Sequence, residues 1–401
     1  MDSKTTFREY RPETDSEQVR VLLNGVFTSA PFEVEDWNSW TATDFTAPVA
    51  EQNGTIIGAI PLKRRNYKVG QDGETVAWVE HRVGVSEASR AMGIGSAMQT
   101  CAKSFLEGRG DVLLVYRGGE RSAGYHFYEK NGLYDTTYIR PIALASQEVA
   151  APRSELDIAW RSADDFLRQE ERWYAIFADC FADRAGYAVR SPGYLNGLAS
   201  TGLWRRAMRC DFSYAVATRS GRPVGYAVVG ERAGSTFLMD LAAEGRQADV
   251  AVALVGAAME GRERLTAYTQ DGTLVADAFT TLGAAPPSRG KGGCSIMVHI
   301  LDPESTAGRV LHPVPALRGL ELRYWTPERD GVLQSPQAPD RVITLELKEH
   351  MLSRLLMRRL DISAALAEER ITLHGGCPED TALLARAFAP APWTTCRMDF
   401  L

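Results

Sequence analysis

The stretch TVAWVEHRVGVSEASRAMGIGSAM, Thr75–Met98, decides how the first part of this chain folds. Its first half, Thr75–Val85, is rich in valine and has no proline and no glycine before Gly84, which predicts a β-strand. The second half predicts a helix, because apolar residues recur there at helical spacing: Ile94, Ala97, Met98, Cys101 and Phe105.

A glycine-rich connection, RAMGIGS from Arg90 to Ser96, joins the predicted strand to the predicted helix. Glycines let a ligand approach the backbone, and the first turn of a helix presents unpaired N–H groups that attract phosphate. A nucleotide P-loop is excluded because no Gly-Lys-Ser/Thr follows, and a dinucleotide fingerprint would need a third glycine. The connection resembles the pyrophosphate loop of the GCN5-related N-acetyltransferases (GNAT), which reads Arg/Gln-x-x-Gly-x-Gly/Ala, although ordinary turn chemistry also produces Gly-x-Gly.

A second motif follows the short apolar strand predicted at Asp111–Tyr116. Phe127-Tyr128-Glu-Lys-Asn-Gly132-Leu133 is similar to the Phe-Tyr-x-x-x-Gly-Phe segment of the same superfamily, with leucine for the last phenylalanine. The resemblance implies that acetyl-CoA is the co-substrate and that Tyr128 is the general acid; Tyr125 is the competing tyrosine. It also implies cofactor contacts along the strand and the loop: Val83, Gly84, Val85, Arg90, Ala91, Met92, Gly93, Ile94, Gly95 and Ser96.

Composition limits the other functions. The chain has 401 residues and a net charge of −6, so no basic surface for nucleic acid is expected. No apolar run reaches membrane-spanning length and no signal-peptide core opens the chain, which predicts a cytoplasmic protein without a membrane partner. The six cysteines are scattered and the six histidines are unclustered, so we expect reduced thiols and no metal site.

An aromatic and acidic segment, residues 31–45, is the candidate acceptor site. In the GNAT layout this segment lies over the acceptor side, and aromatic rings with carboxylates suit a cationic amine. The alternative is an amphipathic helix whose aromatic residues are core and whose acids face solvent. The candidate residues are Phe32, Glu35, Asp36, Trp37 and Trp40, with His81 as a further candidate that a structural role would explain equally well.

The remaining chain predicts an α+β protein with three domains. In the first, residues 1–144, Thr14-Asp15-Ser16-Glu17 predicts the start of a helix that reaches Phe27. The second, residues 152–301, partly repeats the pattern with a helix predicted at 164–181, but it has no Arg-x-x-Gly-x-Gly. We therefore interpret the chain as tandem GNAT folds, with mixed central sheets flanked by helices and a degenerate second copy. The third, residues 302–401, resembles a sterol-carrier-protein-like α/β domain.

This three-part order resembles the Eis (enhanced intracellular survival) acetyltransferases. The resemblance implies acetyl transfer to a primary amine of a cationic small molecule, aminoglycoside-like or a polyamine, or to a lysine side chain, in a homo-oligomer such as a hexamer. It also implies that the C-terminal carboxylate, here that of Leu401, assists as base, with Asp399 and Phe400 beside the substrate. Two alternatives stay open: a transferase that uses a longer acyl-CoA, and a non-catalytic acyl-CoA-binding scaffold or sensor.

Overall fold

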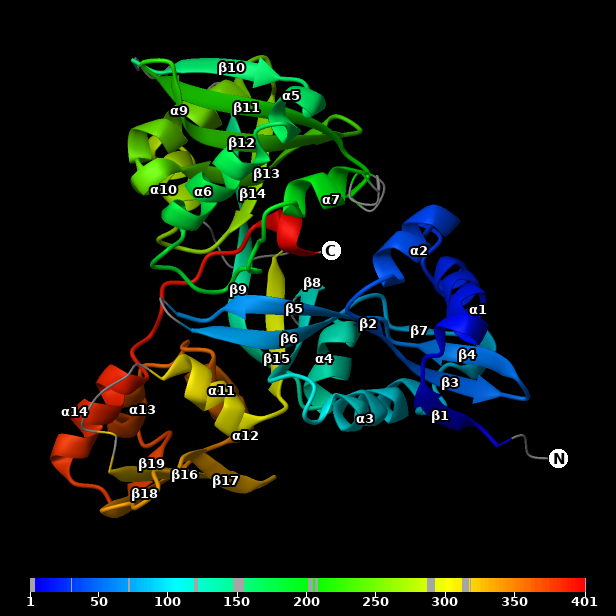
Figure 1. Ribbon diagram of the computed structural model, residues 1–401, viewed down its shortest axis with the longest axis vertical. Helices are drawn as coiled ribbons and strands as arrows, with labels where there is room; N and C mark the ends of the chain where they lie inside the picture. Colours follow the sequence, from blue (N-terminus) through cyan, green and yellow to red (C-terminus); the bar gives the residue numbers. More distant parts are fainter. Residues whose placement is uncertain are drawn as a thin grey trace. The chain divides into compact units, whose positions relative to one another are not determined.

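The computed structural model describes residues 4–29, 31–70, 73–118, 122–146, 155–200, 205, 208–286, 293–311, 317 and 319–400. The chain forms two compact units, which we describe separately (Figure 1). Unit 1 contains Met1–Phe27, Thr43–Tyr138 and Ser295–Ala391, and unit 2 contains Thr28–Ala42, Ile139–Cys294 and Pro392–Leu401. The domain boundaries given above stay a prediction.

Unit 1 contains a small sheet and a larger mixed sheet. The small sheet has the strand order β1-β3-β4-β7: β1 (Thr6–Glu9), β3 (Pro48–Gln52), β4 (Thr55–Ala59) and β7 (Gly84–Val85). The larger sheet has the order β9-β15-β8-β6-β5-β2 in this unit, with β6 parallel to β8 and antiparallel to β5. Its strands are β2 (Phe45–Thr46), β5 (Leu62–Lys68), β6 (Glu74–Glu80), β8 (Val112–Gly118), the first part of β9 (Tyr134–Ala145) and β15 (Cys294–Ile300).

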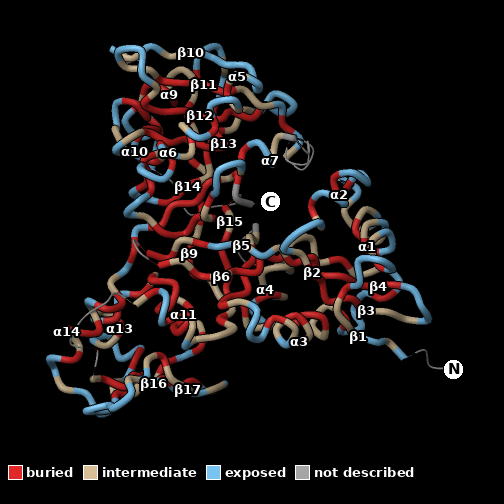
Figure 2. The backbone as a smooth tube through the Cα atoms, viewed as in Figure 1, coloured by how far each residue is buried: buried red, intermediate tan, exposed pale blue. Residues whose placement is uncertain are grey.

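Helix α3 (Ile94–Leu106) packs on the small sheet, and its buried side chains share one core with residues of the larger sheet. The predicted helix is confirmed, but its buried face is rotated slightly from the predicted one, because Ala97, Cys101 and Phe105 are only partly buried. Buried residues follow this helix and the central strands in Figure 2. The buried face of α3 consists of Ile94, Met98, Gln99, Ala102 and Leu106.

The predicted strand Thr75–Val85 is wrong as one continuous element. β6 ends at Glu80, and β7 resumes at Gly84 in the other sheet. Between them, Arg82 adopts a φ of 46°, which turns the chain from one sheet to the other. The break leaves Val83 outside the larger sheet.

The first helix also differs from its prediction. α1 (Pro12–Val26) begins two residues before Thr14, with Pro12 in the first turn where its missing N–H costs nothing. Asp15 does not start the helix; its carboxylate accepts a hydrogen bond of 2.7 Å from the Arg11 N–H and is paired with Arg8. No helix in the described part of the chain is long and apolar enough to cross a bilayer.

The later part of unit 1 adds a second, four-stranded sheet with the order β17-β16-β18-β19. Its strands are β16 (Leu320–Trp325), β17 (Asp330–Gln334), β18 (Arg341–Glu346) and β19 (Thr372–His374). Ser305 and Arg309 on the first of its helices contact the Asp111 carboxylate at the start of β8, which joins this segment to the larger sheet. The helices are α11 (Pro303–Val310), α12 (Glu349–Leu356), α13 (Ile362–Ala367) and α14 (Pro378–Ala387).

Unit 2 is built on the strand order β10-β11-β12-β13-β14-β9. The strands are β10 (Asp157–Arg161), β11 (Asp211–Arg219), β12 (Arg222–Arg232), β13 (Ser235–Ala243), β14 (Arg264–Thr269) and the second part of β9. The single helix predicted at 164–181 is wrong, because α5 ends at Leu167 and α6 begins at Glu170. The helices are α2 (Val34–Thr41), α5 (Ala163–Leu167), α6 (Glu170–Cys180), α7 (Tyr194–Ser200), α9 (Ala248–Met259) and α10 (Leu274–Thr281).

Candidate active site

The N-terminus of α3 has the properties of an anion-binding site. Gly93 precedes the helix with a φ of 78°, and a Cβ at this position would meet nothing within 4 Å. Among the described residues no side chain caps this terminus, and its first turn has no acidic residue. Uncapped N–H groups at the positive end of a helix dipole favour a phosphate ligand.

The loop before this helix is open to solvent. Ala91 adopts a φ of 63°, and the neighbouring Met92 side chain is 66% exposed. The Arg90 side chain turns back and donates a hydrogen bond from Nε to the Val85 carbonyl over 3.3 Å. Of the other predicted cofactor residues, Ile94 lies in the core, whereas Ser96 is partly buried in the first turn of α3.

The short strand β7 has one free edge beside this loop. It pairs with β4 through Gly84 and Val85 and forms the end of the small sheet. Pairing between β6 and β8 stops at Glu80 and Val115, although β8 continues to Gly118. Because β6 ends at Glu80, the residues of β8 after Val115 are not paired with β6 in the described chain.

Tyr128 lies on the short helix α4 (Ala123–Lys130), which has well-defined ends. The Ser122 hydroxyl accepts a hydrogen bond from the Tyr125 N–H at the start, and Gly132 adopts a φ of 73° after the end. The helix ends at Asn131, and the glycine that follows takes the left-handed conformation typical of a helix C-terminus. Tyr128 itself is 7% exposed and packs in the core that contains α3.

The two sequence motifs contact each other. A Cβ added to Gly95 would lie 3.1 Å from the ring of Phe127, the residue that precedes Tyr128. The absence of a side chain at Gly95 thus lets α4 approach the first turn of α3. The N-terminus of α3 and Tyr128 therefore belong to one packed arrangement.

Charged groups on two sides act on the Tyr128 hydroxyl. Burial raises its pKa well above the usual value of 10, the Glu80 carboxyl group raises it further, and the Arg117 guanidinium acts in the opposite direction. Glu80 is itself buried, and burial raises its pKa to about 8. Gln99 Nε2 donates a hydrogen bond of 2.8 Å to Glu80 Oε2.

The competing tyrosine has a different environment. The Tyr125 hydroxyl donates a hydrogen bond of 2.6 Å to Asp135 Oδ2. Donating its proton to a thiolate would require breaking this bond to a charged acceptor.

His81 follows directly on Glu80 and is partly buried. Burial lowers its pKa to about 3, and the charges of Arg65, Arg82 and Lys63 add to this effect. The ring is therefore neutral near pH 7.

The candidate acceptor residues are on or next to α2. The rings of Phe32, Trp37 and Trp40 form one cluster, with centroids 5.3–5.7 Å apart, and all three are buried. Asp36 is also buried, whereas Glu35 is exposed. The aromatic residues of this segment are thus mainly core, as the alternative interpretation predicted, although the burial of Asp36 departs from it.

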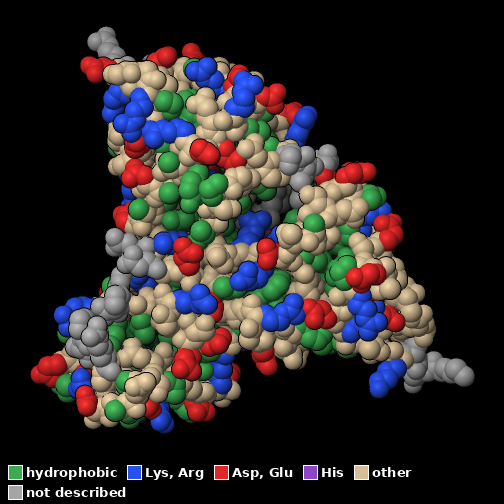
Figure 3. Space-filling model, viewed as in Figure 1, with side chains coloured by type: hydrophobic (Ala, Val, Ile, Leu, Met, Phe, Trp, Pro, Cys, Tyr) green, Lys and Arg blue, Asp and Glu red, His purple; other side chains and the backbone are tan. Residues whose placement is uncertain are grey.

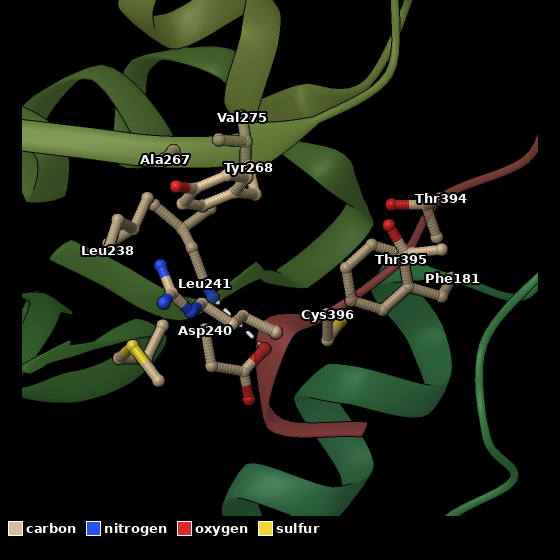
Figure 4. A pocket seen from close by; sticks show the side chains of 12 residues that line it. Phe181, Leu238, Asp240, Leu241, Ala267, Tyr268, Val275, Thr394, Thr395 and Cys396 are labelled. Atoms are coloured by element: carbon tan, nitrogen blue, oxygen red, sulfur yellow. Dashed lines mark hydrogen bonds between the residues drawn. The ribbon is translucent and has the colours of Figure 1, made fainter. Parts of the chain in front are cut away.

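The C-terminal segment is anchored in unit 2. The Arg397 guanidinium lies between the rings of Phe237 and Tyr268, 4.6 and 4.5 Å from their centroids, and Met398 is fully buried. Residues Thr394–Arg397 line a cavity of about 20 Å³ together with Asp240 and Tyr268, which is room for one water molecule (Figure 4). Leu401 and the side chains of Asp399 and Phe400 lie outside the described residues.

Sequence reasoning did not select four polar residues around Tyr128: Glu80, Gln99, Lys103 and His299. Lys103 Nζ donates to the Asn131 carbonyl over 2.5 Å, and His299 Nδ1 lies 3.0 Å from the Gly132 carbonyl. Both therefore hold the end of the helix that carries Tyr128. Glu80 could have been found, because it is in phase with Trp78 on the strand face that packs on α3.

Surface charge is mixed on the visible face, where lysine and arginine alternate with acidic side chains (Figure 3). Within the described ranges, no group of three His, Cys, Asp or Glu side chains could hold a metal ion.

Comparisons with known proteins agree with this geometry. Residues 9–133 match the model of the acetyltransferase (GNAT) family. The chain is similar to a GCN5-related N-acetyltransferase from Kribbella flavida, with 14% identity, 99% coverage of both chains and a TM-score of 0.68. A second one, from Anabaena variabilis, has 13% identity, covers 99% of this chain and 100% of its own, and has a TM-score of 0.72.

Eis1 from Mycobacterium abscessus is similar over 97% of this chain and 99% of its own, with 15% identity and a TM-score of 0.65. The sequence matches no curated protein. At these identities the solved structures show the fold, and the family model identifies the domain. Residues 9–133 are therefore a GNAT acetyltransferase domain, and the protein is an enzyme of the acyltransferase class.

Proposed function

We propose that this protein transfers the acetyl group of acetyl-CoA to a primary amine, with the α3 N-terminus holding the pyrophosphate and Tyr128 acting as general acid. The observation that carries this proposal is the contact between Gly95 and Phe127, which couples the uncapped terminus to the helix of Tyr128. The acceptor is a cationic small molecule, aminoglycoside-like or a polyamine, or a lysine side chain, as in the Eis-like proteins that the chain resembles.

The chemistry is direct attack in a ternary complex. The amine nitrogen attacks the thioester carbonyl, and backbone N–H groups near Val83 and Val85 stabilise the oxyanion. Tyr128 then protonates the departing thiolate, and the C-terminal carboxylate of Leu401 assists in removing a proton from the amine. The Tyr125 hydroxyl is bound to Asp135, which supports Tyr128 as the acid.

The proposal assigns acceptor binding to Phe32, Glu35, Asp36, Trp37, Trp40, His81, Asp399 and Phe400.

The second domain, in this proposal, is a GNAT-like fold that binds no cofactor. In unit 2 acidic side chains bind groups in the connection from β13 to α9. Asp179 accepts a hydrogen bond from the Gly245 N–H, and Glu244 forms ion pairs with Arg172 and Arg222. The Gly245 N–H is thus already bound to Asp179 and is not available to a pyrophosphate. The proposal further includes the sterol-carrier-like third domain, a homo-oligomer such as a hexamer, and a cytoplasmic location.

One assay tests the function. The purified full-length protein is incubated with acetyl-, propionyl- or myristoyl-CoA and a panel of polyamines, aminoglycosides and lysine peptides, and release of free thiol is followed. We expect amine-dependent release that is fastest with acetyl-CoA. Preference for myristoyl-CoA, or binding of acyl-CoA without release in the presence of any amine, would refute the proposal.

A further inference from the structure

A buried carboxyl group lies beside the proposed acid without the partners that a buried carboxylate requires. Glu80 is 4% exposed, and Gln99 donates a hydrogen bond to its Oε2. Glu80 Oε1 and Gln99 Oε1 are both buried without a hydrogen-bond partner in that part of the molecule. A carboxylate left in this state is costly, so the site favours the protonated acid.

The groups around Glu80 come from two helices of unit 1, α3 and α4. Gln99 and Lys103 face it from α3, and Tyr128 faces it from α4, while Arg117 on β8 acts on Tyr128. The Tyr128 hydroxyl lies within hydrogen-bonding reach of the Glu80 carboxyl group, which lowers the pKa of Glu80 and raises that of Tyr128. Burial has a larger effect than these neighbours and raises the pKa of Glu80 to about 8.

Tyr128 alone is a poorly matched donor. Its pKa is raised well above 10, whereas an ordinary thiol has a pKa of about 8.5, so proton transfer from the phenol to the thiolate runs uphill. A carboxylic acid with a pKa of about 8 matches the thiol closely.

We propose that Glu80 is a positioning residue and proton reserve for Tyr128: its buried carboxyl group, held by Gln99, returns a proton to the Tyr128 phenolate. This inference rests on the proposed function of Tyr128 as the acid. When the carbon–sulfur bond breaks, the Tyr128 O–H bond breaks and an S–H bond forms. The Glu80 O–H bond then breaks as the tyrosine O–H bond re-forms. The carboxylate regains a proton from solvent, which receives the one that the amine nitrogen loses.

The test is the rate of a single turnover as a function of pH. In the unaltered protein we expect the rate to fall above about pH 8, as Glu80 loses its proton. Glu80→Gln should lower the rate roughly 10²-fold, the lower end for a positioned acid. It should also remove the fall in rate above pH 8, which we call the alkaline limb, without a change in acetyl-CoA affinity. In a Tyr128→Phe background, Glu80→Gln should cause no further loss, because the reserve acts only through Tyr128. An equal loss in both backgrounds, or an unchanged limb, would overturn the proposal.

A second variant keeps the test valid if Glu80→Gln does not fold. Gln99→Met removes the hydrogen bond that favours the carboxylate, so the alkaline limb should move to higher pH. Thr100→Ala, at the adjacent exposed position of α3, is the matched control and should leave the limb in place. A limb that stays in place in Gln99→Met would overturn the proposal.

A measurement without turnover tests the role of Glu80 separately from the proposed acetyl transfer. In protein with carbon-13-labelled tyrosine, an NMR titration of Glu80→Gln should show a lower pKa for the Tyr128 phenol. An unchanged pKa would overturn the role of Glu80 as proton reserve and leave the proposed acetyl transfer untouched. Failure of the unaltered protein to acetylate any amine would refute the proposed function and the reserve with it.

Discussion

Gly95 and Phe127 meet at the junction of the two motifs, where a Cβ on the glycine would lie 3.1 Å from the phenylalanine ring. This glycine is therefore required by packing between α3 and α4. By contrast, Gly93 faces open space and is required by its φ of 78°. The two glycines of one loop thus serve different purposes.

Gly93→Ala tests the anion-binding terminus. Alanine at a positive φ costs about 1 kcal/mol of folding stability. It should also displace the loop, so acetyl-CoA affinity measured by calorimetry should fall. Gly108→Ala is the matched control, because Gly108 has a φ of 70° and equally open surroundings beyond the other end of α3. The control should lose similar stability and keep its affinity for acetyl-CoA; equal affinity in both variants would contradict this role of the loop.

Tyr128→Phe should reduce turnover roughly 10²–10⁴-fold, the range for loss of a general acid. The affinity for acetyl-CoA should change little, because the hydroxyl acts mainly in the transition state. Tyr125→Phe should reduce turnover far less, since that hydroxyl is bound to Asp135. Steady-state rates and calorimetry on both variants decide the assignment, and the opposite order of losses would show that Tyr125 is the acid.

Glu80 should also make folding stability depend on pH. Its pKa is raised on folding from 4.5 to about 8, so its contribution is complete below pH 4.5 and is lost as pH rises to about 8. The loss corresponds to about 3–5 kcal/mol at 1.36 kcal/mol per pKa unit. In urea unfolding, Glu80→Gln should therefore gain stability relative to the unaltered protein between pH 5 and pH 8. A Glu80→Gln curve that ran parallel to that of the unaltered protein would refute the burial argument.

The end of the chain offers another prediction. Because Arg397 and Met398 fix the preceding residues in unit 2, two glycines added after Leu401 should move the carboxylate and leave these anchors in place. Activity should fall while acetyl-CoA affinity and thermal stability stay the same. Full activity of the extended protein would exclude the C-terminal carboxylate as base.

The sequence predicted those parts of the site that depend on local chemistry. Gly93 and Gly132 both adopt positive φ values at helix ends, where the motifs placed them. Glu80 and Gln99 were missed because their contact joins a strand to a helix 19 positions away, which no local pattern reports. The break after Glu80 was also missed, since Arg82 makes the turn without a glycine.

Long-range pairing explains the other differences. β15 follows unit 2 in the sequence but joins the larger sheet of unit 1, where the Ile296 carbonyl accepts a hydrogen bond from Thr136. Asp36 is buried although a carboxylate is expected at the surface, because helical spacing puts it on the same face as Trp40, four positions later.

Transfer of a labelled acetyl group is the most direct test of the central claim. The unaltered protein and Tyr128→Phe are mixed with acetyl-CoA carrying carbon-13 in the acetyl group and with a polyamine, and the amine is analysed by mass spectrometry. The account predicts a labelled, acetylated amine from the unaltered protein and far less from Tyr128→Phe, with acetyl-CoA bound equally by both. Equal amounts of product from the two proteins, or no labelled amine while acetyl-CoA is bound, would contradict it.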